Sequence, residues 1–475
     1  MSARLLPLGP AADRAGSPGR ADPTGGGATA VVEAGACGAK AARLSAAVRA
    51  GFPVLPGWVV PAAESRPAVR AAAAVLRGGQ PAAGRRTVLS HVPDPALAAS
   101  LREAAIRLGG RVIVRSSSQL EADPRWSGAF STVAGVGPDE VMTAVRSCWA
   151  SAFAVDPLAR LGSCGLPLEA LELAVLLQPE ICPAAGGVAR VVPPAPGSEA
   201  AGVVAPAPGS EAAGLSRPVR AGPGGVDVVV EGIEGHPGPL LTGWADGASA
   251  RVILPDLAAG GSLLDLLGRD LVISVAWLAA GVYRCLGDGT IEWAVQNGQV
   301  WLWQSRPAQP APADPGPGPG SAGAPCPVDA PSRTRAPSST GAPGPDLTAR
   351  ERMPLLSAAV RQHGRHLRGR PAVAGQAAGR LVACRPHERP PAASRDAILL
   401  IDRPLPALAP LLFTARGVLA RSGAGGSHLA EVARSLSVPM VIGCHPETVT
   451  GAGPPGAPWL AAIDGTTGDV ALFPG

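Results

Sequence analysis

The chain has 475 residues, of which 46% are hydrophobic, and a formal net charge of +5. That length and hydrophobic content allow a sizeable core and two or three domains. The small charge, with arginines spread out and few aromatic residues between them, argues against a nucleic-acid-binding protein. The start lacks the apolar core of a signal peptide, and the longest apolar run, 271–282, is too short to span a membrane. The eight cysteines show no metal-binding spacing, so we expect reduced thiols in a cytoplasmic protein without a membrane partner.

The first part of the chain contains one unusual residue. Residues 1–30 have no periodicity, and we expect them to be disordered. Of the 41 basic residues, Lys40 alone is a lysine, which favours a site that needs a compact, rotatable ammonium; chance survival is the alternative. Lys40 lies between a glycine turn and a helix predicted from Ala41 to Arg49. Because phosphate oxygens bind well at a helix N-terminus, Lys40 is a candidate phosphate ligand.

A second cationic candidate follows a helix-rich stretch, 61–109. Residues 111–114 form a predicted strand that leads directly into Arg115 and three serines. An arginine at a strand end is able to hold a phosphate through two parallel hydrogen bonds.

Two further segments follow in this part of the chain. Gly128, Ser131 and Thr132 indicate a second small loop. The continuous apolar run 173–181 predicts a buried strand that carries Gln178 near its end.

The segment 290–307 is a predicted hairpin around Asn297-Gly298. A two-residue loop would place Glu292 and Gln304 on opposite faces, whereas a three-residue loop would place both on one face with Arg306. A carboxylate, an amide oxygen and a guanidinium on one face would suit a Mg²⁺–triphosphate. The alternative is the solvated face of an edge hairpin, and the turn alone does not decide between them.

A Pro/Gly-rich tract, 308–347, follows the hairpin and predicts a flexible linker with a span of roughly 35 Å. A helix is expected from Arg350 to Leu367, and short strands from Gly375 onward. These strands are predicted at 379–384, 397–403, 417–420, 439–443 and 469–473.

Between two of these strands lies the segment SGAGGSHLAEVARSLSVPMVIG, residues 422–443. Its apolar residues follow the spacing of a short helix, and Ser427 is a suitable N-cap. His428 would then lie in the first turn, where unpaired N–H groups favour an anion such as a phosphoryl group. The alternative is an ordinary loop histidine beside a helix.

Five motifs occur together in the order found in one known family. They are GAKAARL with GFPVLPG, then VRSS, LLQ, IEWAVQNGQVWLWQSRP and GAGGSHLAEVARSLSVP. Together they resemble the phosphoenolpyruvate synthase, pyruvate phosphate dikinase and rifampicin phosphotransferase superfamily. The resemblance covers most of 31–307 and 375–475.

The resemblance implies a reaction and a set of residues. In that family ATP is split, its β-phosphoryl passes to a histidine on a swivelling domain, and AMP and phosphate are released. Carried over by motif, His428 is the catalytic phosphoryl carrier, and Glu292 and Gln304 would hold Mg²⁺. The implied ligands of Mg-ATP as a whole are Lys40, Arg115, Gly128, Thr132, Gln178, Glu292, Gln304 and Arg306.

The predicted fold class is α/β (α+β), with an ATP-grasp-like nucleotide-binding domain and a small β/β/α phosphohistidine domain. The predicted divisions are a disordered extension (1–30), the nucleotide-binding domain (31–307), a linker (308–347), a short helical segment (348–374) and the phosphohistidine domain (375–475).

Two departures from the family pattern leave alternatives open. Thr290 stands where many members have an acidic residue, and no large acceptor domain is evident. The first hypothesis is a dikinase-type phosphotransferase that acts on a small molecule, pyruvate or a hydroxylated compound, with the acceptor domain on a separate polypeptide or reduced to the helical segment. The second is an ATP-binding module that has lost turnover, and the third is a phosphohistidine carrier charged by another kinase.

Overall fold

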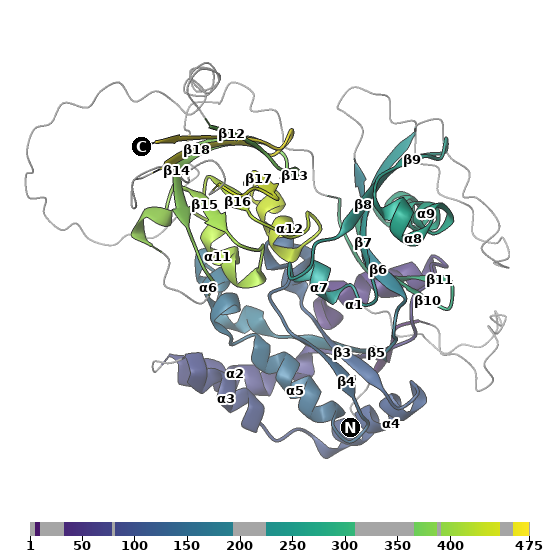
Figure 1. The fold of residues 1–475 in the computed structure, drawn as a ribbon. Coiled ribbons are helices and arrows are strands. Elements are labelled where there is room, and N and C mark those ends of the chain that lie inside the picture. The colour runs from purple at the N-terminus through teal and green to yellow at the C-terminus, as the bar shows by residue number, and fades with distance from the viewer. Residues whose placement is uncertain are drawn as a thin grey trace, which may run out of the picture.

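A computed structural model describes residues 5–9, 33–77, 81–192, 225–308, 365–386, 391–446 and 459–474. In these ranges the chain forms three β-sheets with helices packed against them (Figure 1). Two sheets come from residues before 309, and the third comes from residues after 364. The architecture is a mixture of helix and sheet, as predicted. Within the described ranges, every helix is too short or too polar to cross a membrane.

The first sheet is buried on both faces. In spatial order it contains β1 (Leu6–Pro7), β2 (Trp58–Val60), β5 (Ala174–Pro179), β3 (Val112–Ser117) and β4 (Thr132–Val136). Alternate residues of the apolar run in β5 face two different cores, because successive side chains of a strand point to opposite faces. One core is shared with α1 (Ala34–Arg49). The other is formed with α2 (Arg66–Leu76), α3 (Pro81–Ser90), α4 (Pro95–Arg107), α5 (Val141–Ser151) and α6 (Val155–Ser163).

The expectation of disorder throughout 1–30 is wrong at Leu6–Pro7. These residues form β1 and pair with β2, and Leu8 is only 1% exposed. Local composition could not reveal this strand, because its stability comes from a partner fifty residues away. The other residues of 1–30, apart from 5–9, lie outside the described ranges, as do the linker 309–347 and residues 348–364.

The second sheet has one apolar face and one polar face. Its strands are β11 (Gln299–Arg306), β10 (Thr290–Gln296), β6 (Ala185–Val192), β7 (Val226–Glu234), β8 (Ala248–Leu254) and β9 (Ala258–Gly260). The apolar face packs on α8 (Leu263–Leu267) and α9 (Arg269–Leu286). Gly268, with a positive φ of 83°, separates α8 from α9. The polar face carries Glu231 and Glu292.

The β10–β11 hairpin combines features of both predicted loop geometries. Its turn is the two-residue Asn297-Gly298, since Gln296 pairs with Gln299. Glu292 nevertheless pairs with Gln304, because Trp303 is an extra residue that forms a β-bulge in β11. The bulge shifts the register by one residue and brings the two polar side chains to one face.

The third sheet belongs to a β/β/α module. In spatial order it contains β12 (Arg365–Arg368), β19 (Asp469–Pro474), β18 (Trp459–Asp464), β14 (Gln376–Ala383), β15 (Ile398–Ile401), β16 (Gly417–Ala420), β17 (Met440–Ile442) and β13 (Arg370–Val373). One core lies between the parallel strands and the helices α11 (Ala409–Leu412) and α12 (His428–Ser435). A second core lies between the same parallel strands and the antiparallel pair β18–β19.

The expected helical segment 348–374 is wrong for the residues that the structure describes. Residues 365–368 and 370–373 are strands β12 and β13, which pair with β19 and β17. These two strands lie at opposite edges of the sheet, so pairing partners far along the chain outweigh local helix propensity.

The centre of the second sheet depends on two glycines. Gly187 on β6 pairs with Gly232 on β7 and with the fully buried Trp293 on β10. A Cβ at Gly187 would lie 1.9 Å from the backbone oxygen of Glu231, and a Cβ at Gly232 would lie 2.8 Å from the indole ring.

We expect Gly187→Ala to lower the free energy of unfolding by about 3 kcal/mol or more, because the new methyl overlaps backbone rather than a movable side chain. Gly260→Ala is the matched control, since a Cβ there meets nothing within 4 Å. Denaturant titration measures both variants, and equal stability of the two would contradict the packing described here.

Candidate active site

Six polar residues are buried where the first and second sheets meet. Each is only 2–7% exposed, which is unusual for charged side chains unless they are paired or functional. They come from α1, β3, β5, β10 and β11, and all six were predicted from the sequence: Lys40, Arg115, Gln178, Glu292, Gln304 and Arg306.

Arg115 links the two sheets. Its guanidinium donates to the backbone oxygen of Trp303 at 2.8 Å, to Gln178 Oε1 at 3.1 Å and to Gln304 Oε1 at 3.3 Å. The bulge explains the first contact, because an extra residue in a strand leaves backbone groups outside the regular ladder. Burial lowers the pKa of Arg115 to about 10, so the side chain remains cationic near neutral pH.

Glu292 and Arg306 form a buried ion pair with an oxygen–nitrogen distance of 2.6 Å. Burial by itself raises the pKa of the Glu292 carboxyl, but the basic groups around it, Arg306 foremost, lower it by more. The carboxyl therefore has a pKa below its usual value and is ionised at neutral pH.

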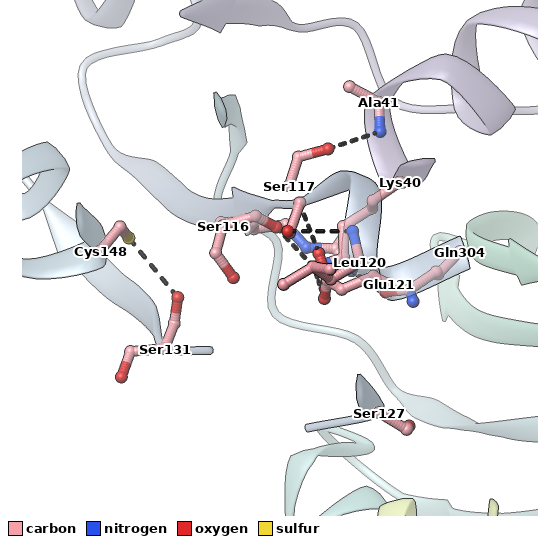
Figure 2. A network of polar contacts seen from close by, with 12 residues as sticks. Lys40, Ala41, Ser116, Ser117, Leu120, Glu121, Ser127, Ser131, Cys148 and Gln304 are labelled. Carbon is pink, nitrogen blue, oxygen red and sulfur yellow. Dashed lines mark hydrogen bonds and ion pairs between the residues drawn. The ribbon is translucent and has the colours of Figure 1, made fainter. Parts of the chain in front are cut away.

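Lys40 lies in α1 just after the kink at Gly38, beside Ser116 and Ser117 at the end of β3 (Figure 2). Its Nζ donates to the backbone oxygen of Ser116 at 2.6 Å and contacts Glu121 Oε1 at 3.2 Å. Burial lowers the pKa of Lys40, while Glu121 opposes that shift. The regular helix begins after Gly38, which has a positive φ of 73°. A Cβ added at this position would lie 2.2 Å from the backbone oxygen of Ser117, so only glycine fits there.

Glu121 was not predicted as a site residue. Besides contacting Lys40, its Oε2 accepts the N–H of Ser118 at 2.9 Å and completes a capping box for the short 3-10 helix Gln119–Ala122. The Ser-x-x-Glu spacing of 118–121 is a known N-terminal signature and would have identified it.

His428 is the first residue of α12, and Ser427 caps this helix as predicted by accepting the N–H of Ala430 at 3.3 Å. The imidazole lies against the loop that precedes β4, where its Nδ1 is 3.0 Å from Ser127 Oγ. A Cβ at Gly128 would lie 2.8 Å from the imidazole ring, so only glycine permits this approach. Sequence reasoning identified Gly128 but missed its neighbour Ser127.

The electrostatic surroundings keep His428 neutral. Burial, together with the positive charge of Arg306, lowers its pKa to about 4, although Glu292 has the opposite effect. A neutral imidazole has a lone pair on one nitrogen, which is what a nucleophile requires.

Thr132 lies at the edge of the site. It is the first residue of β4, it pairs with Arg115 across the strands, and it is exposed. The structure therefore places Gly128 at the imidazole and Thr132 on a strand, opposite Arg115 in the ladder, rather than together in one loop.

A magnesium site would have to use few protein ligands. Within the described residues, no group of three or more His, Cys, Asp and Glu side chains is arranged to hold a metal ion. Glu292 and Gln304 are directly opposite each other in the hairpin, and their side-chain oxygens are of the hard type that Mg²⁺ prefers. Since Mg²⁺ is commonly held by one or two protein oxygens plus substrate phosphates and water, this pair fits a nucleotide-bound ion.

Comparison with known protein families finds two matching domains. The AMP/ATP-binding domain of pyruvate phosphate dikinase matches residues 82–213, and the mobile domain of PEP-utilising enzymes matches residues 393–468. Both matches are to domains of PEP-utilising enzymes, and they occur in the order that the sequence motifs predict. The first match contains Arg115 and Gln178, and the second contains His428.

One curated protein is related to part of the chain. The prodigiosin synthesizing transferase PigC of Serratia marcescens is 36% identical over 124 residues. That alignment covers 25% of this chain and 14% of PigC, so the similarity concerns a small part of either protein.

The ring of His428 should titrate near pH 4 instead of near pH 6.5. Its lowered pKa means that protonation is disfavoured in the folded state, so the folded protein loses stability relative to the unfolded chain as the pH falls from about 6.5 to about 4. NMR titration of the ring resonances measures the pKa directly, and a value near 6.5 would contradict the surroundings described for this side chain.

Proposed function

We propose that this protein is an ATP-dependent phosphotransferase of the dikinase type, in which His428 receives the β-phosphoryl group of Mg-ATP. The observation that carries the proposal is the position of His428: a neutral imidazole at a helix N-terminus, within hydrogen-bond distance of Ser127 and in the electrostatic field of Arg306. A phosphoryl carrier needs an unprotonated nitrogen facing cationic groups that neutralise the phosphates.

The residues of the first two sheets have separate proposed roles in an ATP-grasp-like domain. Lys40, Arg115 and Arg306 neutralise the triphosphate, and Gln178 lines the nucleotide pocket. Glu292 and Gln304 hold Mg²⁺, which would further neutralise the phosphate oxygens. These roles agree with the burial of all six side chains and with the excess of positive charge among them.

The transfer step follows from the imidazole geometry. Because Nδ1 faces Ser127, Nε2 is the nitrogen that attacks the β-phosphorus, while Nδ1 keeps its proton in a hydrogen bond to Ser127 Oγ. The N–P bond forms as the bond to the α-phosphate oxygen breaks, which releases AMP, and water then removes the γ-phosphate as inorganic phosphate. The His428 module swivels to deliver the phosphoryl group to a small-molecule acceptor, either pyruvate or a hydroxylated compound, bound on another domain or polypeptide.

The second candidate is an ATP-binding module without turnover, and one residue favours it. Thr290 lies directly opposite Arg306 in the hairpin and is only 7% exposed. It occupies the position where many members of the resembled family have an acidic residue. A threonine hydroxyl there would be a weaker ligand for the nucleotide-bound ion than a carboxylate. ATP binding without phosphoenzyme formation would support this candidate over the first.

Incubation with Mg²⁺ and ATP labelled at the β-phosphorus should give acid-labile label on the protein together with AMP. His428→Ala should abolish both, because it removes the nucleophile, whereas His91→Ala should label like the wild type. Acid quenching and gel counting, with chromatography of the nucleotides, measure the outcome. Label that persists in His428→Ala, or ATP binding without label or AMP in the wild type, would refute the enzyme proposal.

Ser127→Ala should slow phosphoenzyme formation about tenfold, the effect of one hydrogen bond that orients the reacting ring. The affinity for ATP should stay within twofold, since Ser127 contacts the imidazole. Ser100→Ala is the control, because this half-buried serine of α4 donates to the backbone oxygen of Ala96 in its own helix. Rapid-quench measurement of labelling compares the variants, and a wild-type rate in Ser127→Ala would exclude the positioning role.

A further inference from the structure

The segment 423–426, called here the glycine loop, immediately precedes Ser427 and His428 and lies against the second sheet. Its central contact is apolar. Ala424 is 2% exposed and packs in a small cluster with Val188 of β6 and with Leu240 and Leu241 of α7 (Gly238–Leu241). Hydrophobic contact alone would allow the loop to slide or rotate, because it is non-directional.

One end of the glycine loop is held by Glu231. The N–H of Gly426 donates to Glu231 Oε2 at 2.6 Å. A Cβ at Gly425 or at Gly426 would lie 3.0 Å from the carboxylate oxygens, so a side chain at either position would crowd the contact. Glu231 pairs with Val188, which in turn pairs with Glu292, so the docking carboxylate shares a sheet face with the candidate active site.

The other end is held by Asp246, between α7 and β8. The N–H of Gly423 donates to Asp246 Oδ1, and the oxygen of Gly423 accepts from Arg370 Nη2 at 2.7 Å. Arg370 also lies 3.5 Å from Asp246. Gly423 has a φ of 119°, and a Cβ there would lie 2.3 Å from Pro404, so the backbone approaches Asp246 only because the residue is glycine.

We propose that Glu231 and Asp246 are positioning residues that form a two-point latch for the glycine loop and thereby place His428 against Ser127 and Gly128. One carboxylate on β7 and one in the connection before β8 bind backbone N–H groups three residues apart, with the apolar contact of Ala424 between them. Backbone donors at a fixed spacing define both position and orientation, and hydrogen bonds to a charged acceptor are the stronger kind.

The latch accounts for the composition of the loop. Glycines at 423, 425 and 426 let carboxylates reach the backbone, and the contact contains no interlocking large side chain. Such a contact forms and separates without repacking a core. The role of the latch in holding His428 in its loading position rests on the proposed function. The docking contacts themselves do not depend on that function.

The decisive variant is the double substitution Glu231→Ala with Asp246→Ala in the full chain. Asp227→Ala is the matched control, because Asp227 lies on the same strand, β7, but pairs with Arg251 of β8. Hydrogen–deuterium exchange of peptides covering 421–428 reports on the two N–H groups directly. We expect exchange at least tenfold faster in the double variant and unchanged in the control.

Phosphoenzyme formation from β-labelled ATP tests the positioning role. The rate of phosphoenzyme formation should fall at least tenfold in the double variant, with ATP affinity unchanged within twofold. Glu231→Gln with Asp246 intact should recover most of the rate, because an amide oxygen still accepts the hydrogen bond. Unchanged exchange near strand β3 shows that the fold is intact.

The outcomes that would overturn this inference differ from the one that would refute the proposed function. Loop protection that persists in the double variant, or that is lost equally in Asp227→Ala, overturns the latch. Faster loop exchange with an unchanged loading rate overturns the positioning role. Absence of phosphoenzyme in the wild type refutes the proposed function instead, and the exchange measurement then judges the latch alone.

Discussion

The site depends on the single β-bulge at Trp303. The extra residue turns Gln304 and Arg306 to the face that carries Glu292, and it leaves the Trp303 oxygen for the guanidinium of Arg115. Arg115 in turn connects the first sheet to the second. A regular hairpin with the same turn would have separated these side chains onto two faces, because a one-residue shift of register reverses every side chain.

The charges around this junction explain why polar side chains remain buried there. Lys40, Arg115 and Arg306 carry positive charge, whereas Glu121 and Glu292 supply the negative charge nearest to them. Burying charge is expensive unless it is paired, so an excess of cations inside a protein is expected where an anionic ligand completes the pairing. Burial, together with the charges of Arg306 and Lys40, disfavours protonation of His428 and keeps its imidazole neutral.

The contact between the His428 module and the other two sheets is made by small residues and backbone groups. Gly128 meets the imidazole, Gly423 and Gly426 meet carboxylates, and Arg160 of α6 donates to the oxygens of Ser127 and Pro406, which lie on opposite sides of the contact. Directional hydrogen bonds set the orientation, with the small apolar cluster around Ala424 between two of them. Such a contact suits a module that docks in one defined position and leaves it again.

Local signals in the sequence were sufficient for several features. The N-cap Ser427, the Asn297-Gly298 turn and the parallel strands β15, β16 and β17 follow from residue preferences over a few positions. The lone lysine and the ordered motifs also pointed to six polar residues, and the structure shows that all six are buried. Such residue types are seldom buried unless they are paired or functional.

Tertiary structure alone decided the rest, because those features depend on partners distant in the chain. Strands β1, β12 and β13 exist through pairing with distant strands, which local propensity does not report. The bulge at Trp303 is stabilised by Arg115, almost two hundred residues earlier, so the turn residues could not reveal it. Ser127, Glu231 and Asp246 acquire their importance only from the docked position of His428 and the glycine loop, which no spacing in the sequence encodes.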